Sequence, residues 1–120
     1  MAITLENNAR NAAVDAIAAL HNSGTLEFQT SADAEVATVT FSATAFGAAT
    51  GGSATANTIT PDSSATGGTT TKFVTKTSAS AIIATGTVGT SGTDIIIDNT
   101  DVAPGVTVDL TSLTLSVPAS

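Results

Sequence analysis

The sequence contains no cysteine, tryptophan or tyrosine, and its only basic residues are Arg10, Lys72 and Lys76. Without cysteine there can be no disulfide, no thiolate metal site and no thiol catalysis. Ten acidic residues bring the net charge to −7. Nucleic acids and anionic membranes are bound by clustered lysine and arginine, so we expect neither as a partner. The missing aromatics also weigh against a carbohydrate-binding platform.

Long apolar runs are missing as well. Glu6, Arg10 and Asp15 interrupt the first twenty residues, so the pattern of a secretory signal peptide is not present. No other stretch has the length and hydropathy of a membrane span. We expect the protein to be made and used in the cytoplasm, or to leave it by a route other than standard secretion.

One helix is predicted, from Thr4 to His21 within an N-terminal helical arm of residues 1–22. Thr4 is the expected N-cap, Glu6 complements the positive end of the helix dipole, and Asn22-Ser23-Gly24 ends the helix. Apolar residues recur at three- and four-residue spacing and form one stripe: Leu5, Ala9, Ala12, Ala13, Ala16, Ile17 and Leu20. We expect this stripe to lie on the rest of the chain as a lid, or to contact another subunit.

Residues 25–118 have the alternation of β-strands, clearest at 25–29, 37–41, 69–77 and 81–88. A chain of 120 residues forms one domain by size. We therefore predict a single, mainly β domain, an antiparallel β-sandwich of about seven short strands with one N-terminal α-helix. Residues 42–68 are rich in Ala, Thr, Gly and Ser, which favours an exposed loop or one ordered by a partner.

The C-terminal third, from Gly86 to Val117, has the densest β-branched content, and we expect the core to be assembled on it. Three successive isoleucines, Ile95 to Ile97, indicate a strand covered on both faces. Further on, the apolar residues up to Leu110 share one parity and those from Leu113 share the other. A β-bulge near Thr111-Ser112 is the favoured explanation; the alternative is that two partners cover different halves.

No catalytic, cofactor-binding or metal-binding residue is predicted, and the expected protein is not an enzyme. Asp94, Asp98 and Asp101 are the nearest approach to a metal site, but their spacing matches no calcium loop, and turn aspartates explain them. His21 has no partner set for catalysis and is expected to stabilise the helix end. The serines and glycines match neither a nucleophile elbow nor a phosphate loop.

Two groups of short motifs resemble a family of small tailed-bacteriophage structural proteins. The first is Met1-Ala-Ile-Thr-Leu5 with Ala9-Arg-Asn-Ala-Ala-Val-Asp-Ala-Ile17, followed by the strand Gly24-Thr-Leu-Glu-Phe-Gln29. The second runs from Asp62-Ser-Ser-Ala-Thr-Gly67 through Lys72-Phe-Val-Thr75, Thr85-Gly-Thr-Val88 and Asp94-Ile-Ile-Ile-Asp-Asn99 to Pro104-Gly105. The chain differs from the pattern at Phe73, which Val74 follows where relatives carry arginine.

The resemblance implies a virion component, and among these a capsid decoration, or cement, protein made in the host cytoplasm. Its partners would be the major capsid protein and copies of itself in an oligomer or symmetric array. It also implies that deletion of residues 1–22 weakens capsid association while the β domain stays folded. The alternatives are a tail, neck or fibre-associated subunit, and a host-surface or glycan-binding module.

Overall fold

The computed structural model describes residues 3–118, which form one helix and nine strands. The helix is α1 (Asn7–Leu20). The strands are β1 (Thr25–Gln29), β2 (Glu35–Thr40), β3 (Ser53–Thr55), β4 (Gly68–Thr69), β5 (Lys72–Lys76), β6 (Ile82–Gly89), β7 (Ile95–Ile96), β8 (Asp101–Val102) and β9 (Thr114–Ser116). The prediction of a mainly β chain with one N-terminal helix is confirmed.

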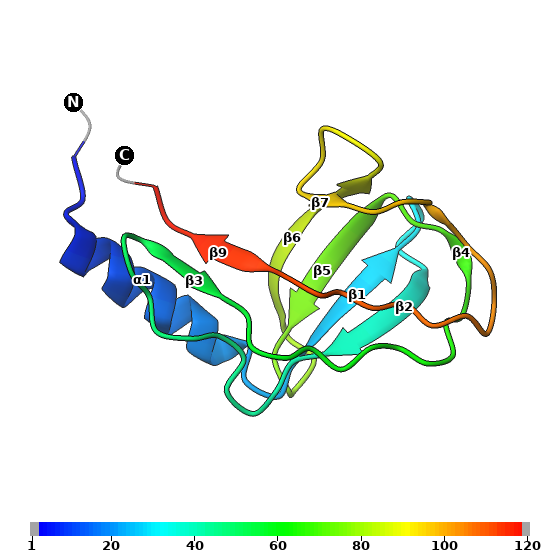
Figure 1. Ribbon diagram of the computed structural model, residues 1–120, viewed down its shortest axis with the longest axis horizontal. Helices are drawn as coiled ribbons and strands as arrows, with labels where there is room; N and C mark the ends of the chain where they lie inside the picture. The colour runs from blue at the N-terminus through cyan, green and yellow to red at the C-terminus, as the bar shows by residue number, and fades with distance from the viewer. Residues whose placement is uncertain (1–2, 119–120) are drawn as a thin grey trace.

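Five strands form the main sheet, in the order β2-β1-β5-β6-β7 (Figure 1). The first four pair antiparallel, with Phe28 of β1 opposite Phe73 of β5. Strand β7 instead runs parallel to β6, with Ile95 opposite Val88. The predicted strand at 25–29 is confirmed as β1, and the one at 81–88 is confirmed as β6, displaced by one residue.

The single antiparallel β-sandwich of about seven strands is not confirmed. Beyond the main sheet there are only two-stranded ladders, β3 with β9 and β4 with β8. The chain that crosses the inner face of the main sheet is largely irregular, and its turns explain why. Gly67, Gly68 and Gly105 have positive φ, and Pro104 cannot donate to a ladder. These breaks prevent a second continuous sheet.

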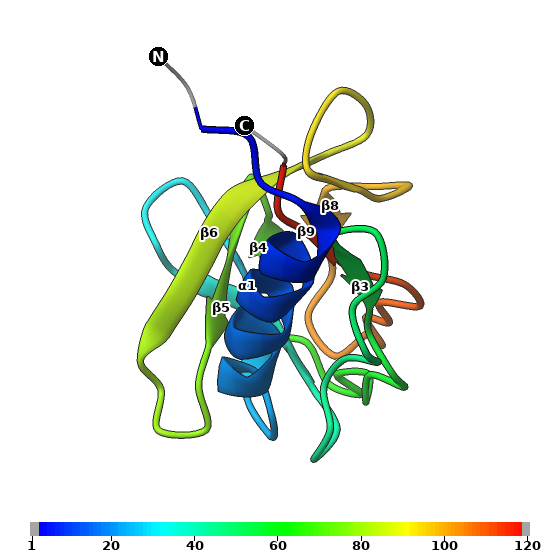
Figure 2. The ribbon, with the colours of Figure 1, turned by 90° about the vertical axis from the view of Figure 1, so that its left-hand side faces the viewer.

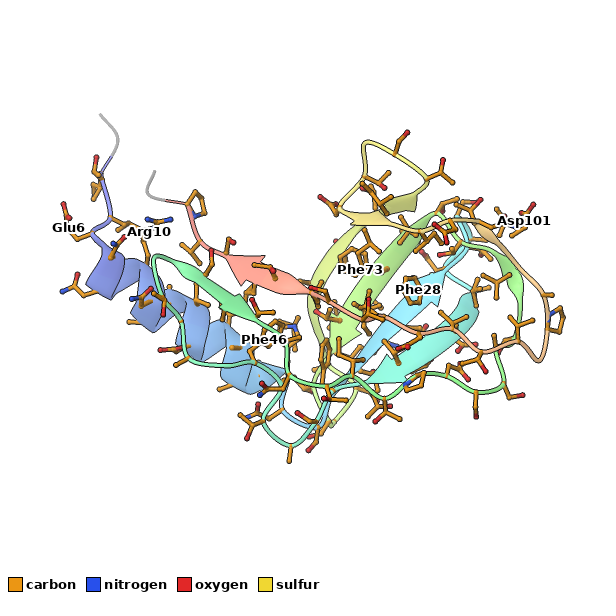
Figure 3. The ribbon with its side chains drawn as sticks, viewed as in Figure 1. Glu6, Arg10, Phe28, Phe46, Phe73 and Asp101 are labelled. Carbon is orange, nitrogen blue, oxygen red and sulfur yellow. The ribbon has the colours of Figure 1, made fainter. Side chains whose placement is uncertain are left out.

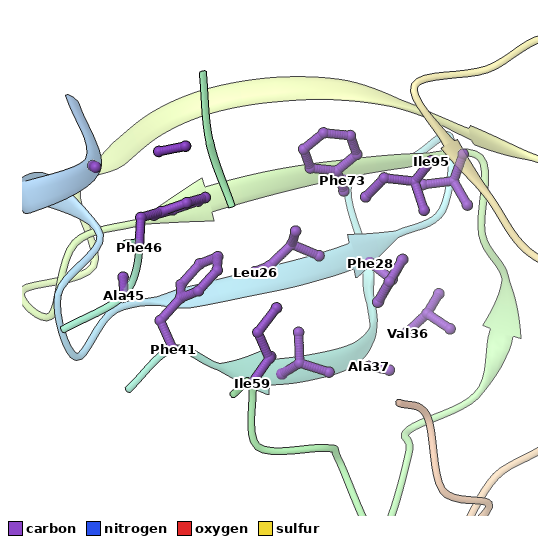
Figure 4. Close-up of a cluster of buried hydrophobic side chains, with 14 of the residues drawn as sticks. Leu26, Phe28, Val36, Ala37, Phe41, Ala45, Phe46, Ile59, Phe73 and Ile95 are labelled. Carbon is purple, nitrogen blue, oxygen red and sulfur yellow. The ribbon is translucent and has the colours of Figure 1, made fainter. Parts of the chain in front are cut away.

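The core lies on β1, β2 and β5 rather than on the C-terminal third (Figure 4). Leu26, Phe28, Val36 and Val39 are at most 2% exposed. From the C-terminal third, only Val88 and Ile95 are buried among the described hydrophobic residues, and the others are half-buried at best. The expectation that the core is assembled on these strands is wrong because they form the cover of the core, with one side facing water.

Residues 42–68 are mostly irregular, as predicted, but part of the segment packs into the core, which an exposed or partner-ordered loop did not predict. Phe46, Ala54, Ile59 and Ala65 are buried in the core cluster. The segment contains β3, and Thr60 exchanges two backbone hydrogen bonds with Thr40 at the end of β2. Its small side chains explain the error, because alanine and glycine let the backbone approach the helix and the sheet closely while adding little to a hydrophobic pattern.

The change of parity between Leu110 and Leu113 does not come from a β-bulge; the alternative explanation, in which different segments cover the two halves, is confirmed. Val108 pairs with Asp62, whereas Leu115 pairs with Ala54 of β3. Two different segments therefore cover the two halves, and a bulge within one continuous strand is not formed. The isoleucine run is likewise not covered on both faces, since Ile95 is 6% exposed and Ile96 is 64% exposed.

Candidate functional site

The side of the helix that is buried is not the predicted apolar stripe, although it overlaps the stripe at Ala13 and Ile17. Val14 and Ala18 are buried, and the polar residues beside them hold neighbouring backbone groups. Asn11 Oδ1 accepts a hydrogen bond of 2.8 Å from the Gly52 N–H, and Asp15 Oδ1 accepts one of 2.9 Å from the Ala49 N–H. On the same side, Arg10 Nε donates to the Val117 carbonyl at 2.9 Å. Asn11, Val14, Asp15 and Ala18 fall on one side of a helix, so the polar residues anchor α1 to the β3–β9 ladder.

Most of the predicted apolar stripe consequently faces outward, and only Ala13 and Ile17 are half-buried. We define the outer helix face by six exposed apolar residues, of which Ile3 and Leu5 lie in the segment just before the helix and Ala9, Ala12, Ala16 and Leu20 lie on it. Ile3 is 80% exposed and Leu20 is 52% exposed. Arg10 and Asp15, the two charged residues within α1, hydrogen-bond the chain beside the buried side of the helix. Glu6 is exposed next to Leu5, just before the helix begins (Figure 3).

The helix also begins later than predicted, at Asn7 rather than near Thr4. Glu6 occupies the N-cap in extended backbone and makes no side-chain capping bond, and no acidic residue lies in the first turn. The Asn7 side chain accepts a bond of 3.0 Å from Arg10 Nη1. Thr4 therefore does not cap the helix, and the exposed segment that carries Ile3 and Leu5 precedes it.

His21 ends the helix as a buried core residue, 2% exposed, and not as a surface cation. Its Nδ1 lies 3.0 Å from the Ile17 carbonyl oxygen, which can only accept, so Nδ1 carries the proton. Nε2 then accepts from the Thr75 hydroxyl at 3.0 Å. The rings of Phe41 and Phe46 stand edge-on to the imidazole at 5.3 and 5.4 Å. Burial lowers the pKa of His21, which keeps the ring neutral despite the opposing effect of the Ile17 hydrogen bond.

Burial of Val14, Ala18 and His21 has a further consequence. Deletion of residues 1–22 would remove all three from the core. We therefore expect it to disrupt the β domain, contrary to the expectation from the sequence.

The three candidate aspartates, Asp94, Asp98 and Asp101, do not share a hydrogen-bond partner. Asp94 accepts hydrogen bonds from the Thr87 N–H and hydroxyl at 2.9 and 3.0 Å, and the backbone bond above all lowers the pKa of Asp94. Asp101 accepts from the Thr69 hydroxyl at 2.7 Å where β4 meets β8. Asp98 is exposed. Within residues 3–118, no three His, Asp or Glu side chains gather in a way that could hold a metal ion.

Two ion pairs link β5 to β1 and to the turn that follows β1. Lys76 Nζ lies 2.9 Å from Glu27 Oε2, and Lys72 pairs with Asp33. Desolvation raises the pKa of Glu27, but hydrogen bonds from Gln29 and Lys76 and the lysine charge outweigh it and leave the pKa lowered. Together with Arg10, which binds the Val117 carbonyl, all three basic side chains therefore form hydrogen bonds or ion pairs within the chain.

A groove of about 630 Å³ separates residues 94–98 from residues 109–114. Asp94, Asp98 and Asp109 line it together with isoleucine, leucine and threonine, and none of the residues that line it is basic. The groove is therefore lined by acidic, hydroxyl and aliphatic side chains together, with no basic side chain to balance the three carboxylates. Sequence reasoning missed it because its two walls are separated in the chain and are brought together only by the crossing of the C-terminal segment.

Comparison with family models, with curated proteins and with solved structures finds no match for this chain. Within the described residues, α1 is too short and too polar to cross a membrane. The fold and its surfaces define a mainly β protein whose titratable groups mostly bind its own backbone and side chains, and whose outer helix face is apolar and uncovered.

Proposed function

We propose that the protein is a non-enzymatic structural component of a tailed-bacteriophage virion. Within that class we propose a capsid decoration protein that binds the outside of the major capsid shell and stabilises it. The observation that supports this most is the outer helix face, because an uncovered apolar surface on a rigid element is a typical contact for another protein.

The composition of this face suits contact with a preformed shell. Ala9, Ala12 and Ala16 have short side chains that let the helix backbone approach a partner closely, and Leu5 and Leu20 flank them with larger apolar area. Each Å² of apolar surface removed from water contributes about 25 cal/mol, before the cost of association is subtracted. One such contact is weak. Many copies on a symmetric shell bind the assembled state selectively and shift the equilibrium toward it.

The anchoring of α1 also supports a binding role. Asn11, Asp15 and Arg10 hold the helix to the chain, and His21 fixes its end to β5. The face is therefore presented by a helix whose orientation is set before a partner arrives. A preorganised surface loses less conformational entropy when it binds, so more of the contact energy remains as affinity.

The double substitution Ala12→Lys with Ala16→Lys tests this proposal. Both positions are exposed, and lysine is a good helix former, so α1 stays folded while its outer face becomes charged. We expect the double variant to co-sediment with empty shells at least about tenfold more weakly than the unmodified protein. Ser63→Lys is the control: Ser63 is exposed in a different part of the chain, and this variant should bind shells as the unmodified protein does.

Undiminished co-sedimentation of the double variant would overturn the proposed contact. Electron microscopy of labelled virions locates the protein independently. A label spread over the capsid surface supports the proposal, whereas a label confined to the tail or neck contradicts decoration of the shell.

A further inference from the structure

The main sheet has two edges, and the edge at β2 is covered residue by residue. The Gly67 N–H donates to the Val36 carbonyl at 3.0 Å, and Asp62 Oδ2 accepts from the Thr38 N–H at 2.9 Å. At the end of the strand, Thr40 and Thr60 exchange two bonds of 2.8 and 3.0 Å. Every second residue of β2 from Val36 to Thr40 therefore has a partner on its outer side, as natural proteins arrange for an edge strand.

The edge at β6 is covered only at its C-terminal end. There β7 pairs with Val88 and Gly89, and Asp94 binds the Thr87 N–H. From Ile82 to Gly86, no described strand pairs with the outer side of β6, which forms the border of the sheet (Figure 2). The Thr87 N–H points outward to Asp94, so the backbone N–H and carbonyl of Thr85, two residues earlier in a regular ladder, point outward as well.

The open part of β6 lacks the features that normally prevent pairing with another chain. Residues 77–93 contain no charged residue and no proline, although the whole protein carries a net charge of −7. Ile82, at the start of the strand, is 65% exposed. Lysine, proline and inward-pointing charge are the usual protections of an exposed edge, and this edge has none of them.

We propose that β6 pairs antiparallel with β6 of a second copy of this chain, so that two main sheets join into one. The distribution of charge favours a second copy. Two acidic chains repel each other over most of their surfaces, and this edge lies within an uncharged stretch where their backbones can approach. A two-fold axis close to Thr85 makes the contact self-complementary, with the outward backbone groups of each copy bonded to those of the other.

The pairing is weak for one isolated pair of molecules. A short edge strand buries less surface than the roughly 1,200–2,000 Å² of a stable protein–protein interface. Association should therefore depend strongly on protein concentration. If another surface holds two copies side by side, their high local concentration favours the same pairing of β6 with β6. The inference does not depend on the proposed function, because it uses β6 and not the outer helix face.

Two substitutions test the pairing by different means. Thr85→Pro removes an outward N–H that has no bonding role within the sheet, and it places a proline ring on the edge. Ala84→Lys keeps the whole backbone and adds a charge at an exposed position of the same strand. Sedimentation equilibrium over a concentration series measures self-association. Hydrogen exchange of the Thr85 amide, followed by NMR over the same series, reports the edge directly.

We expect the unmodified protein to dimerise with rising concentration and the Thr85 amide to become protected in parallel. Both variants should associate at least about tenfold more weakly. Ser63→Lys and the pair Ala12→Lys with Ala16→Lys should dimerise as the unmodified protein does. Failure of the outer helix face to bind shells would leave these expectations intact, so the two proposals fail separately.

Three results would overturn the inference. One is an unmodified protein that stays monomeric up to about 1 mM, the scale of very weak binding. Another is a dimer that neither β6 substitution weakens. The third is a β6 substitution that reduces binding to shells but leaves self-association unchanged. That result would mean that the open edge of β6 binds the capsid shell and not a second copy.

Discussion

His21 Nε2 and Thr75 Oγ1 lie 3.0 Å apart, in a buried hydrogen bond that joins the end of α1 to β5, the central strand of the main sheet. The same imidazole donates through Nδ1 to Ile17 and packs against Phe41 and Phe46. One neutral side chain thus links the helix, the sheet and the segment after β2, which is why the orientation of α1 depends on this residue.

Thr75→Val tests that hydrogen bond. Valine has nearly the shape of threonine but has no hydroxyl to donate, so Nε2 of His21 becomes a buried acceptor without a partner. We expect the free energy of unfolding to fall by about 1–3 kcal/mol, measured by urea denaturation. Thr71→Val, at an exposed position before the same strand, should change it by less than about 0.5 kcal/mol. Equal effects of the two substitutions would contradict this role.

The stability of the protein should fall in mildly acidic solution because of His21. Burial lowers the pKa of His21 in the folded state below its ordinary value of 6.5, so the unfolded state binds more protons below that pH. The contribution of the neutral His21 side chain to the free energy of unfolding is complete above about pH 6.5. It is lost as the pH falls from there to the pKa of His21 in the folded state. Urea denaturation over this range should show the decline, and His21→Gln should remove it. A decline of the same size in His21→Gln would assign it to other groups.

Asn11→Ala tests the inward orientation of the polar helix residues. The substitution removes the acceptor of the Gly52 N–H, and Gly52 is buried. We expect a loss of about 1–3 kcal/mol in the free energy of unfolding. Asn8→Ala is the matched control, since Asn8 is exposed and bonds only the adjacent Ala9 N–H. Comparable losses in the two variants would mean that α1 does not depend on its polar anchors.

Gly86→Ala tests the contact between β6 and the aromatic ring of β5. A Cβ atom at Gly86 would lie 2.4 Å from Cε1 of Phe73 and 3.0 Å from Oδ2 of Asp94, so the ring must move out of its packed position. We expect a loss of about 1–3 kcal/mol in the free energy of unfolding, measured by thermal or urea denaturation. Gly47→Ala, where the nearest atom is 3.8 Å away, should shift it by less than about 1 kcal/mol.

Local patterns predicted the four longer strands of the main sheet, with the starts of β2 and β5 displaced by two or three residues. Leu26 and Phe28 alternate with Thr25 and Glu27 in β1, a pattern that depends only on the period of a strand. In β5 the three central residues are all buried, so this strand was recognised by its β-forming residues and not by alternating burial. The existence of one helix near the N-terminus was equally visible. What failed was the choice of face, because the alanine stripe satisfied the helical period but faces outward. Asn11 and Asp15 instead bind backbone N–H groups 41 and 34 residues away, which a local pattern does not record.

The C-terminal third shows the same limit. Its isoleucines, valines and leucines predicted strands and a core, yet the segment pairs with residues 62–65 over one half and with β3 over the other. By itself the sequence determined the class of fold, the positions of the longer strands and the absence of cysteine chemistry, because these follow from composition and local period. Only the tertiary structure decided that the core lies on β1, β2 and β5, that His21 is neutral and buried, and that one edge of the sheet is open. Those properties depend on which distant segments meet, and the energy of such contacts is set by three-dimensional packing.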